Sequence, residues 1–146
     1  MFKKILYPTD FSEVSKKALD YVKKLAEAGI KEVVVLHVID EKEIASIRRA
    51  GVYAGIREDL ETIIEKNARE EMKAVEAELK KSGFEVKAKI EIGIPFREIL
   101  RFEEDEGVSA TVLGSHGRSC IKEMFLGSVS EQVIRGSNKP VLIVRR

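Results

Sequence analysis

Short apolar segments alternate along this chain with longer segments whose apolar residues recur at helical spacing, and this alternation constrains the fold more than any other feature. The run VVVL within residues 31–38 has strand length and is typical of a strand covered on both faces. Strands that alternate with helices favour a parallel sheet with right-handed crossovers. The pattern therefore predicts an α/β fold with helices on both faces of the sheet.

The boundaries of the elements follow from the same periodicity. The predicted strands cover residues 3–8, 31–38, 84–92, 109–113 and 140–144, and the predicted helices cover 12–28, 58–81, 95–106 and 128–135. Ser12 suits the start of the first helix and Gly29 its end. Residues 40–57 show no steady apolar period, so we assign no element to them. We expect a single Rossmann-like domain over residues 1–146, with a five-stranded parallel sheet in the order 3-2-1-4-5.

The charge balance excludes one class of function. The chain carries 26 Lys and Arg residues against 25 Asp and Glu residues. A protein that binds nucleic acid nonspecifically usually carries a basic excess, so we expect no nucleic-acid partner. No apolar run approaches the ~18 residues of a membrane helix, so we expect no membrane partner. Cys120 has no second cysteine to pair with, which fits a reducing, cytoplasmic location.

The segment 114–130, GSHGRSCIKEMFLGSVS, concentrates glycine and hydroxyl residues after the fourth predicted strand. Gly114 and Gly117 would let the backbone turn off that strand and approach a ligand without Cβ clashes. The first turn of a helix has free N–H groups and a partial positive charge, which favour phosphate. The last predicted helix opens with Gly127, Ser128, Val129 and Ser130. Arg118 would add a cation, so the segment predicts a phosphate-binding loop.

A second polar segment, Pro8-Thr9-Asp10, follows the first predicted strand. In the order 3-2-1-4-5 the first and fourth strands are neighbours where the strand order reverses, and open α/β sheets bind their ligands at that switch point. Both segments would therefore line one crevice. The chain has no GxxxxGK[ST] motif, no GxGxxG after the first strand and no GxSxG, so other nucleotide-binding and nucleophile motifs do not compete.

The spacing G-x2-G-x9-G-[ST] from Gly114 to Ser128, with PTDFS after the first strand and HVID at the end of the second, resembles the nucleotide-binding branch of the universal stress proteins. The resemblance covers the whole chain, including the terminal SNKPVLIV, and implies a domain of the HUP type. It also implies that the protein binds ATP together with Mg²⁺ or Mn²⁺. In that arrangement one wall consists of Gly114, Ser115, His116, Gly117 and Arg118. The phosphates lie against Gly127, Ser128, Val129 and Ser130, and the base and ribose against Pro8, Thr9, Asp10 and Val38.

Several of these residues also have simpler interpretations. Asp10 after a strand is a common helix cap, and His37 fits a hydrogen-bonded histidine at a strand end better than a catalytic base. The pair Arg48-Arg49 in the segment 40–57 fits a solvated surface, with a flexible lid over the nucleotide as the alternative. One cysteine and two histidines do not make a structural zinc site, so we assign no metal-ligating side chains.

The last predicted strand, PVLIV, would lie at an edge of the sheet. Consecutive apolar residues make an edge that invites pairing. The resembling family pairs through this strand, so we expect a homodimer through residues 140–144.

The leading functional hypothesis is an ATP-binding stress or signalling protein that changes its state or its protein partner with nucleotide occupancy. The second hypothesis is a slow ATPase in which Asp10 or a metal-bound water takes part in hydrolysis, although we assign no catalytic residue. A nucleotide-free dimeric interaction module in the stress response is the third hypothesis. The intact glycines count against it.

Overall fold

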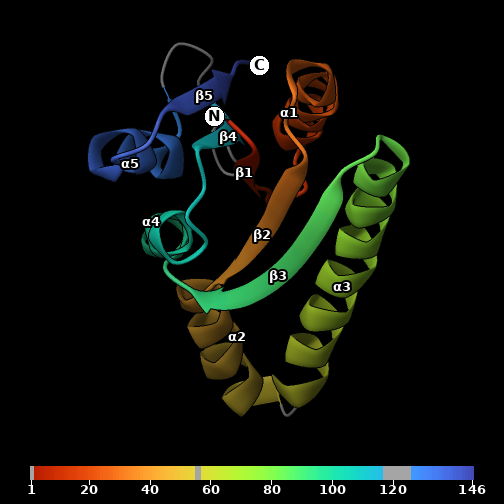
Figure 1. Cartoon of the computed structure of the whole chain (residues 1–146). Coiled ribbons are helices and arrows are strands. Elements are labelled where there is room, and N and C mark those ends of the chain that lie inside the picture. The colour runs from red at the N-terminus through yellow and green to blue at the C-terminus, as the bar shows by residue number, and fades with distance from the viewer. Residues whose placement is uncertain (1, 55–56, 117–125) are drawn as a thin grey trace.

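Five parallel strands form the centre of the computed structural model, which describes residues 2–54, 57–116 and 126–146, with the backbone alone for 52–54 and 57–59 (Figure 1). The strands are β1 (Lys4–Pro8), β2 (Glu32–Asp40), β3 (Glu85–Gly93), β4 (Ala110–Gly114) and β5 (Val141–Val144). Their order is β3-β2-β1-β4-β5, and every neighbouring pair is parallel. The strand order predicted from the sequence is confirmed.

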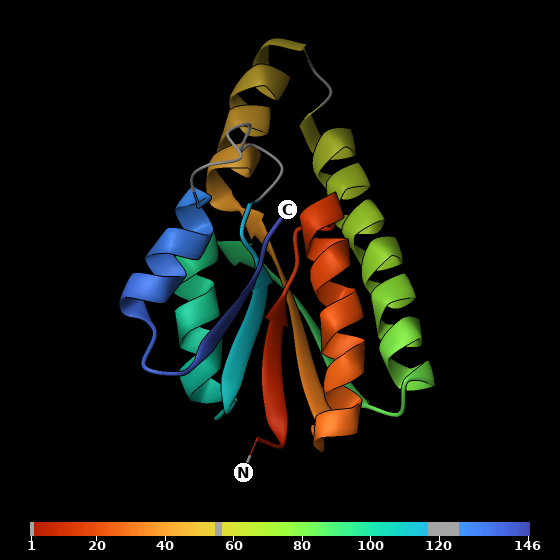
Figure 2. The ribbon, with the colours of Figure 1, turned by 90° about the horizontal axis from the view of Figure 1, so that it is seen from above.

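Helices cover both faces of this sheet. They are α1 (Glu13–Lys24) with the 3₁₀ turn η1 (Leu25–Ala28), α2 (Glu41–Ala54), α3 (Arg57–Lys81), α4 (Pro95–Asp105) and α5 (Ser128–Gly136). Buried residues of α1 and α3 share one core with the sheet, and buried residues of α4 and α5 share a second core on the opposite face. Figure 2 shows these two flanks, with α2 and α3 projecting together beyond the strands. Within the part of the chain that the structure describes, no helix combines the length and apolarity that a membrane crossing needs.

Local signals account for several element boundaries. The Ser12 hydroxyl accepts a hydrogen bond from the Ser15 backbone N–H, and Gly29 adopts a positive φ of 94° where η1 ends, as the sequence predicted for both ends. Along β3, Val86, Ala88 and Ile90 are half-buried between exposed charged residues. That alternation is expected of an edge strand with one covered face.

Residues 40–57 contain a helix that the sequence analysis missed. Helix α2 buries Ile44 and Gly51 and half-buries Ile47, while most of its other described side chains are exposed. The spacing of these three positions is helical, but a glycine in the stripe and the narrowness of the stripe hide the period. The predicted solvated Arg48 is exposed and forms an ion pair with Glu61 of α3, at 2.8 Å.

The pairing of β1 opens a crevice at the switch point. β1 pairs with β2 along its full length, from Lys4 to Pro8, but its register with β4 covers only Ile5 and Leu6. The two strands therefore separate toward their carboxyl ends. This is the location where the topology predicts a ligand.

Candidate functional site

A cavity of about 500 Å³ lies at the carboxyl ends of β1, β2 and β4. Its volume is in the range of small-molecule sites. The structure brings many of the predicted site residues together around it. Those that line the cavity are Pro8, Thr9, Asp10, Val38, Gly114, His116, Val129 and Ser130. Ser115, Gly127 and Ser128 are not among its lining residues, and Gly117, Arg118 and Cys120 lie outside the described residues.

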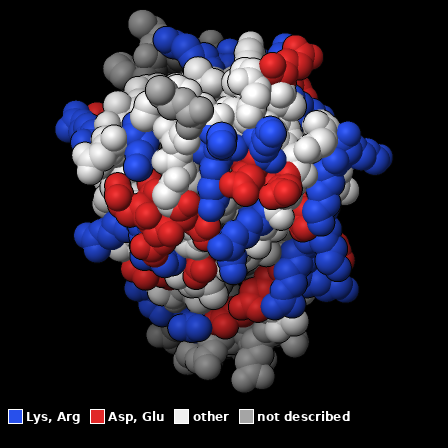
Figure 3. Space-filling model, viewed as in Figure 1, with Lys and Arg blue, Asp and Glu red and all other residues white. Residues whose placement is uncertain are grey.

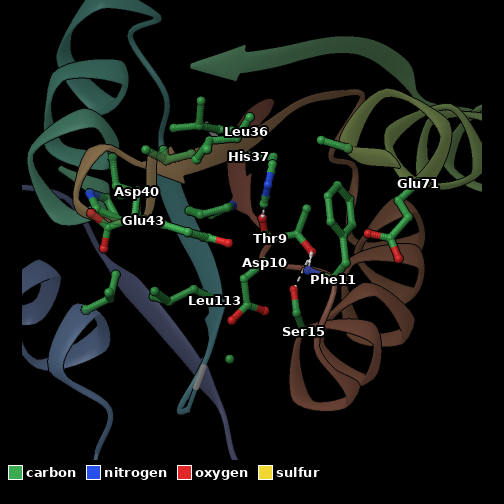
Figure 4. A pocket seen from close by; sticks show the side chains of 18 of the residues that line it. Thr9, Asp10, Phe11, Ser15, Leu36, His37, Asp40, Glu43, Glu71 and Leu113 are labelled. Atoms are coloured by element: carbon green, nitrogen blue, oxygen red, sulfur yellow. Dashed lines mark hydrogen bonds between the residues drawn. The ribbon is translucent and has the colours of Figure 1, made fainter. Parts of the chain in front are cut away.

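The turn after β1 is held by a compact set of hydrogen bonds (Figure 4). The Thr9 hydroxyl accepts from the Phe11 backbone N–H at 3.1 Å and from the Ser15 hydroxyl at 2.5 Å. Asp10 Oδ1 accepts from the Ser12 N–H at 2.9 Å, so Asp10 fixes the turn while Ser12, rather than Asp10, caps α1. Below the turn the Tyr7 phenol donates to the Ser15 carbonyl, and burial raises the pKa of Tyr7 above its usual range. The turn is therefore a preformed part of the cavity wall.

Two aromatic rings that sequence reasoning left out of the site line the same wall. Phe11 has a positive φ of 62°, which is uncommon for a bulky residue, and its side chain is buried. Its ring lies 4.4 Å from the His37 ring. His37 Nδ1 lies 2.7 Å from the Thr9 carbonyl oxygen, so this nitrogen carries the proton that it donates. The predicted hydrogen bond of His37 is confirmed, but His37 lies inside β2, which continues to Asp40, and not at the strand end.

The main chain of Val38 is directed toward the cavity by the alternation of the sheet. Leu36 C=O accepts from the Thr9 N–H, while Lys31 C=O accepts from the Glu85 N–H of β3. In a parallel strand the peptide groups of alternate residues point to opposite neighbours. The N–H and C=O of Val38 therefore point to the side of β1, beyond the residue where β1 ends. They offer one donor and one acceptor to a flat ligand.

Gly114 is required by packing rather than by a turn. A Cβ on Gly114 would lie 2.9 Å from Val14 Cγ1 and 3.3 Å from the Val14 carbonyl carbon. Helix α1 therefore packs directly against the end of β4. The sequence analysis explained this glycine by ligand approach and a sharp turn. The structure adds a contact between a helix and a strand, while Gly114 also lines the cavity.

Ser115 joins three elements through its own main chain. Its N–H donates to the Val144 carbonyl at the end of β5, and its carbonyl accepts from the Gly127 N–H at 2.7 Å. The Ser130 hydroxyl donates to the carbonyls of Gly114 and Ser115, at 2.8 and 3.0 Å. The proton of Ser130 is thus engaged within the protein, although the sequence analysis offered it to phosphate. Ser115 and Ser130 position the wall and the start of α5.

His116 is the unsatisfied group of this wall. Its side chain is 4% exposed, and Nδ1 lies 2.6 Å from the Ser115 hydroxyl. Nε2 is buried and has no hydrogen-bond partner among the residues that the structure describes. A buried polar atom without a partner costs about 1–3 kcal/mol, so such an atom on a cavity wall points to a ligand.

Acidic side chains line the cavity on both sides of the turn after β1. Asp10, Asp40, Glu43 and Glu71 line it, and Figure 4 shows Asp40 and Glu43 on one side of the central turn and Glu71 on the other. No Lys or Arg stands among the described lining residues. Sequence reasoning missed Glu43 and Glu71 because they come from α2 and α3, whose place over the strand ends is a tertiary feature. Across the described ranges no cluster of three or more His, Cys, Asp or Glu side chains is arranged to hold a metal.

Comparisons with known proteins agree on one family. The sequence model of the universal stress protein family matches residues 1–145. Universal stress protein MJ0577 of Methanocaldococcus jannaschii is 45% identical over the whole chain and 96% of its own length. Its solved structure superposes with a TM-score of 0.87 at 46% identity, covering 100% of this chain and 97% of the other.

Two more distant structures share the fold at 23% identity. One is a universal stress protein from Archaeoglobus fulgidus in complex with dAMP, with a TM-score of 0.67 and coverage of 99% and 98%. The other is a universal stress protein in complex with cAMP, with a TM-score of 0.65 and coverage of 99% and 97%.

Proposed function

This chain belongs to the universal stress protein family, and we propose that it binds an adenine nucleotide, ATP with Mg²⁺ or Mn²⁺, in the cavity at the switch point. Nucleotide occupancy then changes the state of the protein or its choice of a protein partner. The observation that carries the proposal is the buried Nε2 of His116 on the cavity wall, which has no hydrogen-bond partner among the residues that the structure describes. A phosphate oxygen would supply the missing partner.

The start of α5 supports placing the phosphates beside His116. Val129 and Ser130 line the cavity from the first turn of this helix, and Ser128 is exposed at its first position. The first-turn N–H groups and the helix dipole favour an anion. The phosphate contacts of Gly117 and Arg118 remain predictions from the sequence.

The other end of the cavity suits a nucleoside. The donor and acceptor of the Val38 peptide groups match the edge of an adenine base, which offers one acceptor and one amino donor. Thr9 accepts two hydrogen bonds, so its own proton remains to be donated to a ligand. The Asp10 carboxylate suits ribose hydroxyls.

The charge of the cavity explains why the proposal includes a divalent cation. A triphosphate would enter a cavity that is lined by four carboxylates and, among the described residues, by no cation. Like charges repel strongly where water is excluded. A divalent cation bound to the phosphates would offset that repulsion. We therefore expect the affinity for ATP to fall when a chelator removes the cation. The dAMP and cAMP complexes of the two distant relatives support an adenine nucleotide as the ligand class.

Titration calorimetry on unfolded and refolded protein tests the proposal, since refolding removes co-purified ligand. We expect ATP with Mg²⁺ to bind once per chain. Ser128→Glu should weaken ATP binding at least about tenfold, because its carboxylate would repel phosphate while still favouring the helix dipole. Gln132→Glu is the matched control, since it adds the same charge to an exposed position of the same helix. Absence of binding in the refolded wild type would overturn the proposal in favour of a nucleotide-free interaction module.

We also propose that the chain forms a homodimer through β5. This strand is at the sheet edge, and Leu142 is 45% exposed there, with Ile134 of α5 41% exposed. Leu142→Lys should convert the dimer to a monomer in sedimentation velocity. Ile92→Lys on the opposite edge strand β3 is the control, because Ile92 is 49% exposed. A monomer at micromolar wild-type concentration would contradict the proposal.

The compartment and the turnover belong to the same proposal. We propose that the protein acts in the cytoplasm, which its single cysteine supports.

Hydrolysis of ATP would be slow at most, and Asp10 is the residue to test. The rate of phosphate release should be measured for the wild type, Asp10→Asn and Ser128→Ala. If both variants keep the wild-type rate, any observed hydrolysis does not take place at this site.

A further inference from the structure

Glu103 of α4 is a buried acid that the nucleotide site does not use. Its side chain is 1% exposed. Its Oε1 accepts a hydrogen bond from the Thr111 hydroxyl of β4 at 2.8 Å, and its Oε2 accepts from the Ser137 hydroxyl at 2.7 Å. Both partners are neutral, and no cation of the described chain lies within ion-pair distance of it.

A carboxyl group is an unfavourable choice for this position. Transferring a carboxylate from water to the protein interior costs free energy, whereas transferring an apolar side chain is favourable. Hydrogen bonds from two hydroxyl groups offset only part of that cost. Apolar replacements of buried charged groups are often neutral or stabilising. The presence of an acid in such a place is therefore better explained by the geometry that it fixes than by a contribution to the stability of the fold.

The geometry that Glu103 fixes is the entry into β5. Ser137 directly follows α5, and its hydroxyl oxygen also accepts from the Lys139 N–H, which shapes the turn. The Thr111 N–H donates to the Pro140 carbonyl at the start of the edge strand. One carboxyl group thus joins α4, the inner strand β4 and the turn that leads to the edge.

A second contact from α4 fixes the same turn. A Cβ on Gly136 would lie 2.7 Å from Leu100 Cδ1, so the end of α5 approaches α4 closely. Leu100 and Glu103 are three residues apart and lie on one side of the helix. Helix α4 therefore contacts the turn before β5 at two points.

We infer that Glu103 positions β5 for pairing with a second copy of the chain, which rests on the dimer proposed above. β5 has four residues and one strand neighbour, β4. Short edge strands open locally, and a register slip of one residue would turn Leu142 to the opposite face. By holding the turn and the inner strand together, Glu103 fixes the register in which β5 meets its copy.

The two hydroxyl partners provide a matched pair of variants. Thr111→Val removes the bond to the inner strand, and Ser137→Ala removes the bond to the turn. We expect Ser137→Ala to weaken the dimer about tenfold and to speed amide exchange in β5. Thr111→Val should weaken the dimer by less, because the bond from Ser137 to Glu103 remains. Sedimentation equilibrium and hydrogen exchange measure the two effects.

The variant Glu103→Leu with Thr111→Val separates positioning from stability. We expect its midpoint of urea denaturation, measured at concentrations where both proteins are monomeric, to equal or exceed that of the wild type, because the apolar pair avoids burying a charge. Its dimer should still be weakened about tenfold. In this background Ser137→Ala should weaken the dimer less than it does in the wild type, because only its bonds to Lys139 are left to lose.

The outcomes distinguish this inference from the dimer proposal. A wild-type monomer at all concentrations would overturn both. If the wild type dimerises and both Ser137→Ala and Glu103→Leu/Thr111→Val dimerise with the same affinity, the inference about Glu103 is wrong but the dimer proposal stands. Dimer affinity that falls only in proportion to stability, with no faster exchange in β5, would reduce Glu103 to a core residue.

Discussion

The turn after β1 and the turn after β4 both line the cavity, but they differ in how their polar groups are satisfied. In the first turn the Thr9 hydroxyl and the Asp10 carboxylate each hold a backbone N–H of the turn. In the second, Ser115 is saturated by β5 and α5, while its neighbour His116 keeps a buried nitrogen without a partner among the described residues. The hydrogen bonds that shape the first turn are made within the protein, whereas the second turn leaves one buried nitrogen, His116 Nε2, without a partner among the described residues.

Because of this difference, we expect substitutions in the two turns to affect different properties, the stability of the fold in one and nucleotide binding in the other. Substitutions in the β1 turn should lower the free energy of unfolding, because they leave buried donors without acceptors. Substitutions at His116 should lower nucleotide affinity and have a smaller effect on stability. The strained φ of Phe11 lies on the satisfied wall, where its buried ring and the contact with His37 hold it.

Thr9→Val should have the largest effect on the satisfied wall. Valine has the shape of threonine but leaves the Phe11 N–H and the Ser15 hydroxyl without their acceptor. We expect a loss of about 3 kcal/mol in the free energy of unfolding, measured by urea denaturation. Thr9→Ser keeps the hydroxyl and should lose much less. Equal losses in the two variants would show that the hydroxyl is not what holds the turn.

Gly114→Ala should come next, since it tests the contact between β4 and α1. The added methyl would meet Val14 Cγ1 at 2.9 Å, and overpacking of this kind costs about 2 kcal/mol. Adding Val14→Ala should restore part of the loss. No recovery in the double variant would mean that the backbone of α1, rather than the Val14 side chain, causes the clash.

His116→Phe tests the unsatisfied wall. Phenylalanine keeps the ring but removes Nε2 and the Nδ1 bond to Ser115. The free energy of unfolding should fall by only about 1 kcal/mol, because the buried Ser115 hydroxyl loses its Nδ1 partner while one unpaired buried nitrogen is removed. ATP affinity should fall about tenfold, which is about 1.4 kcal/mol. Unchanged affinity by calorimetry would exclude His116 as a ligand contact.

Glu106→Gln should have the smallest effect and serves as a control far from both walls. The hydrogen bond from Lys87, opposed by partial burial and aided by Lys4, holds the pKa of the Glu106 carboxyl below its usual 4.5. A lowered folded pKa adds stability that is fully present above the unfolded pKa and is lost as the pH falls through the folded one. We expect a loss of about 1 kcal/mol at pH 7 that shrinks as the pH falls below 4.5, with ATP affinity unchanged.

The pH series has a clear contrary result. If wild type and Glu106→Gln keep the same difference in unfolding free energy from pH 7 to pH 3, the ion pairs with Lys87 and Lys4 contribute nothing that depends on the carboxylate. The surface in Figure 3 shows positive and negative side chains intermingled over the face in view, so a single pair is a small perturbation.

Much of the fold could be predicted from local patterns. The apolar runs placed the five strands, and the alternation with helices placed the switch point between β1 and β4. Ser12 and Gly29 marked helix ends because capping is a local event. Helix α2 was missed because Ile44, Ile47 and Gly51 form a narrow stripe whose partner is another helix, α3.

The chemistry of the site was predicted less completely. The polar segments after β1 and β4 were found because both follow apolar strands at an edge where strand ends meet. The roles of Gly114 and Ser115 differ from those expected, since each depends on a neighbour distant in sequence: α1 for Gly114, β5 and α5 for Ser115. The acids from α2 and α3 carried no local signal at all.

The sequence by itself determined the order of the elements, the parallel sheet and the two segments that meet at its switch point, because periodicity and capping act over a few residues. Only the tertiary structure decided which polar groups are satisfied. Glu103 lies in the acidic run EEDE, which in sequence resembles a solvated helix face, yet it is 1% exposed. His116 lies between glycines in a polar loop, yet its Nε2 is buried. Burial and pairing are set by segments that approach from far along the chain, and no local pattern records them.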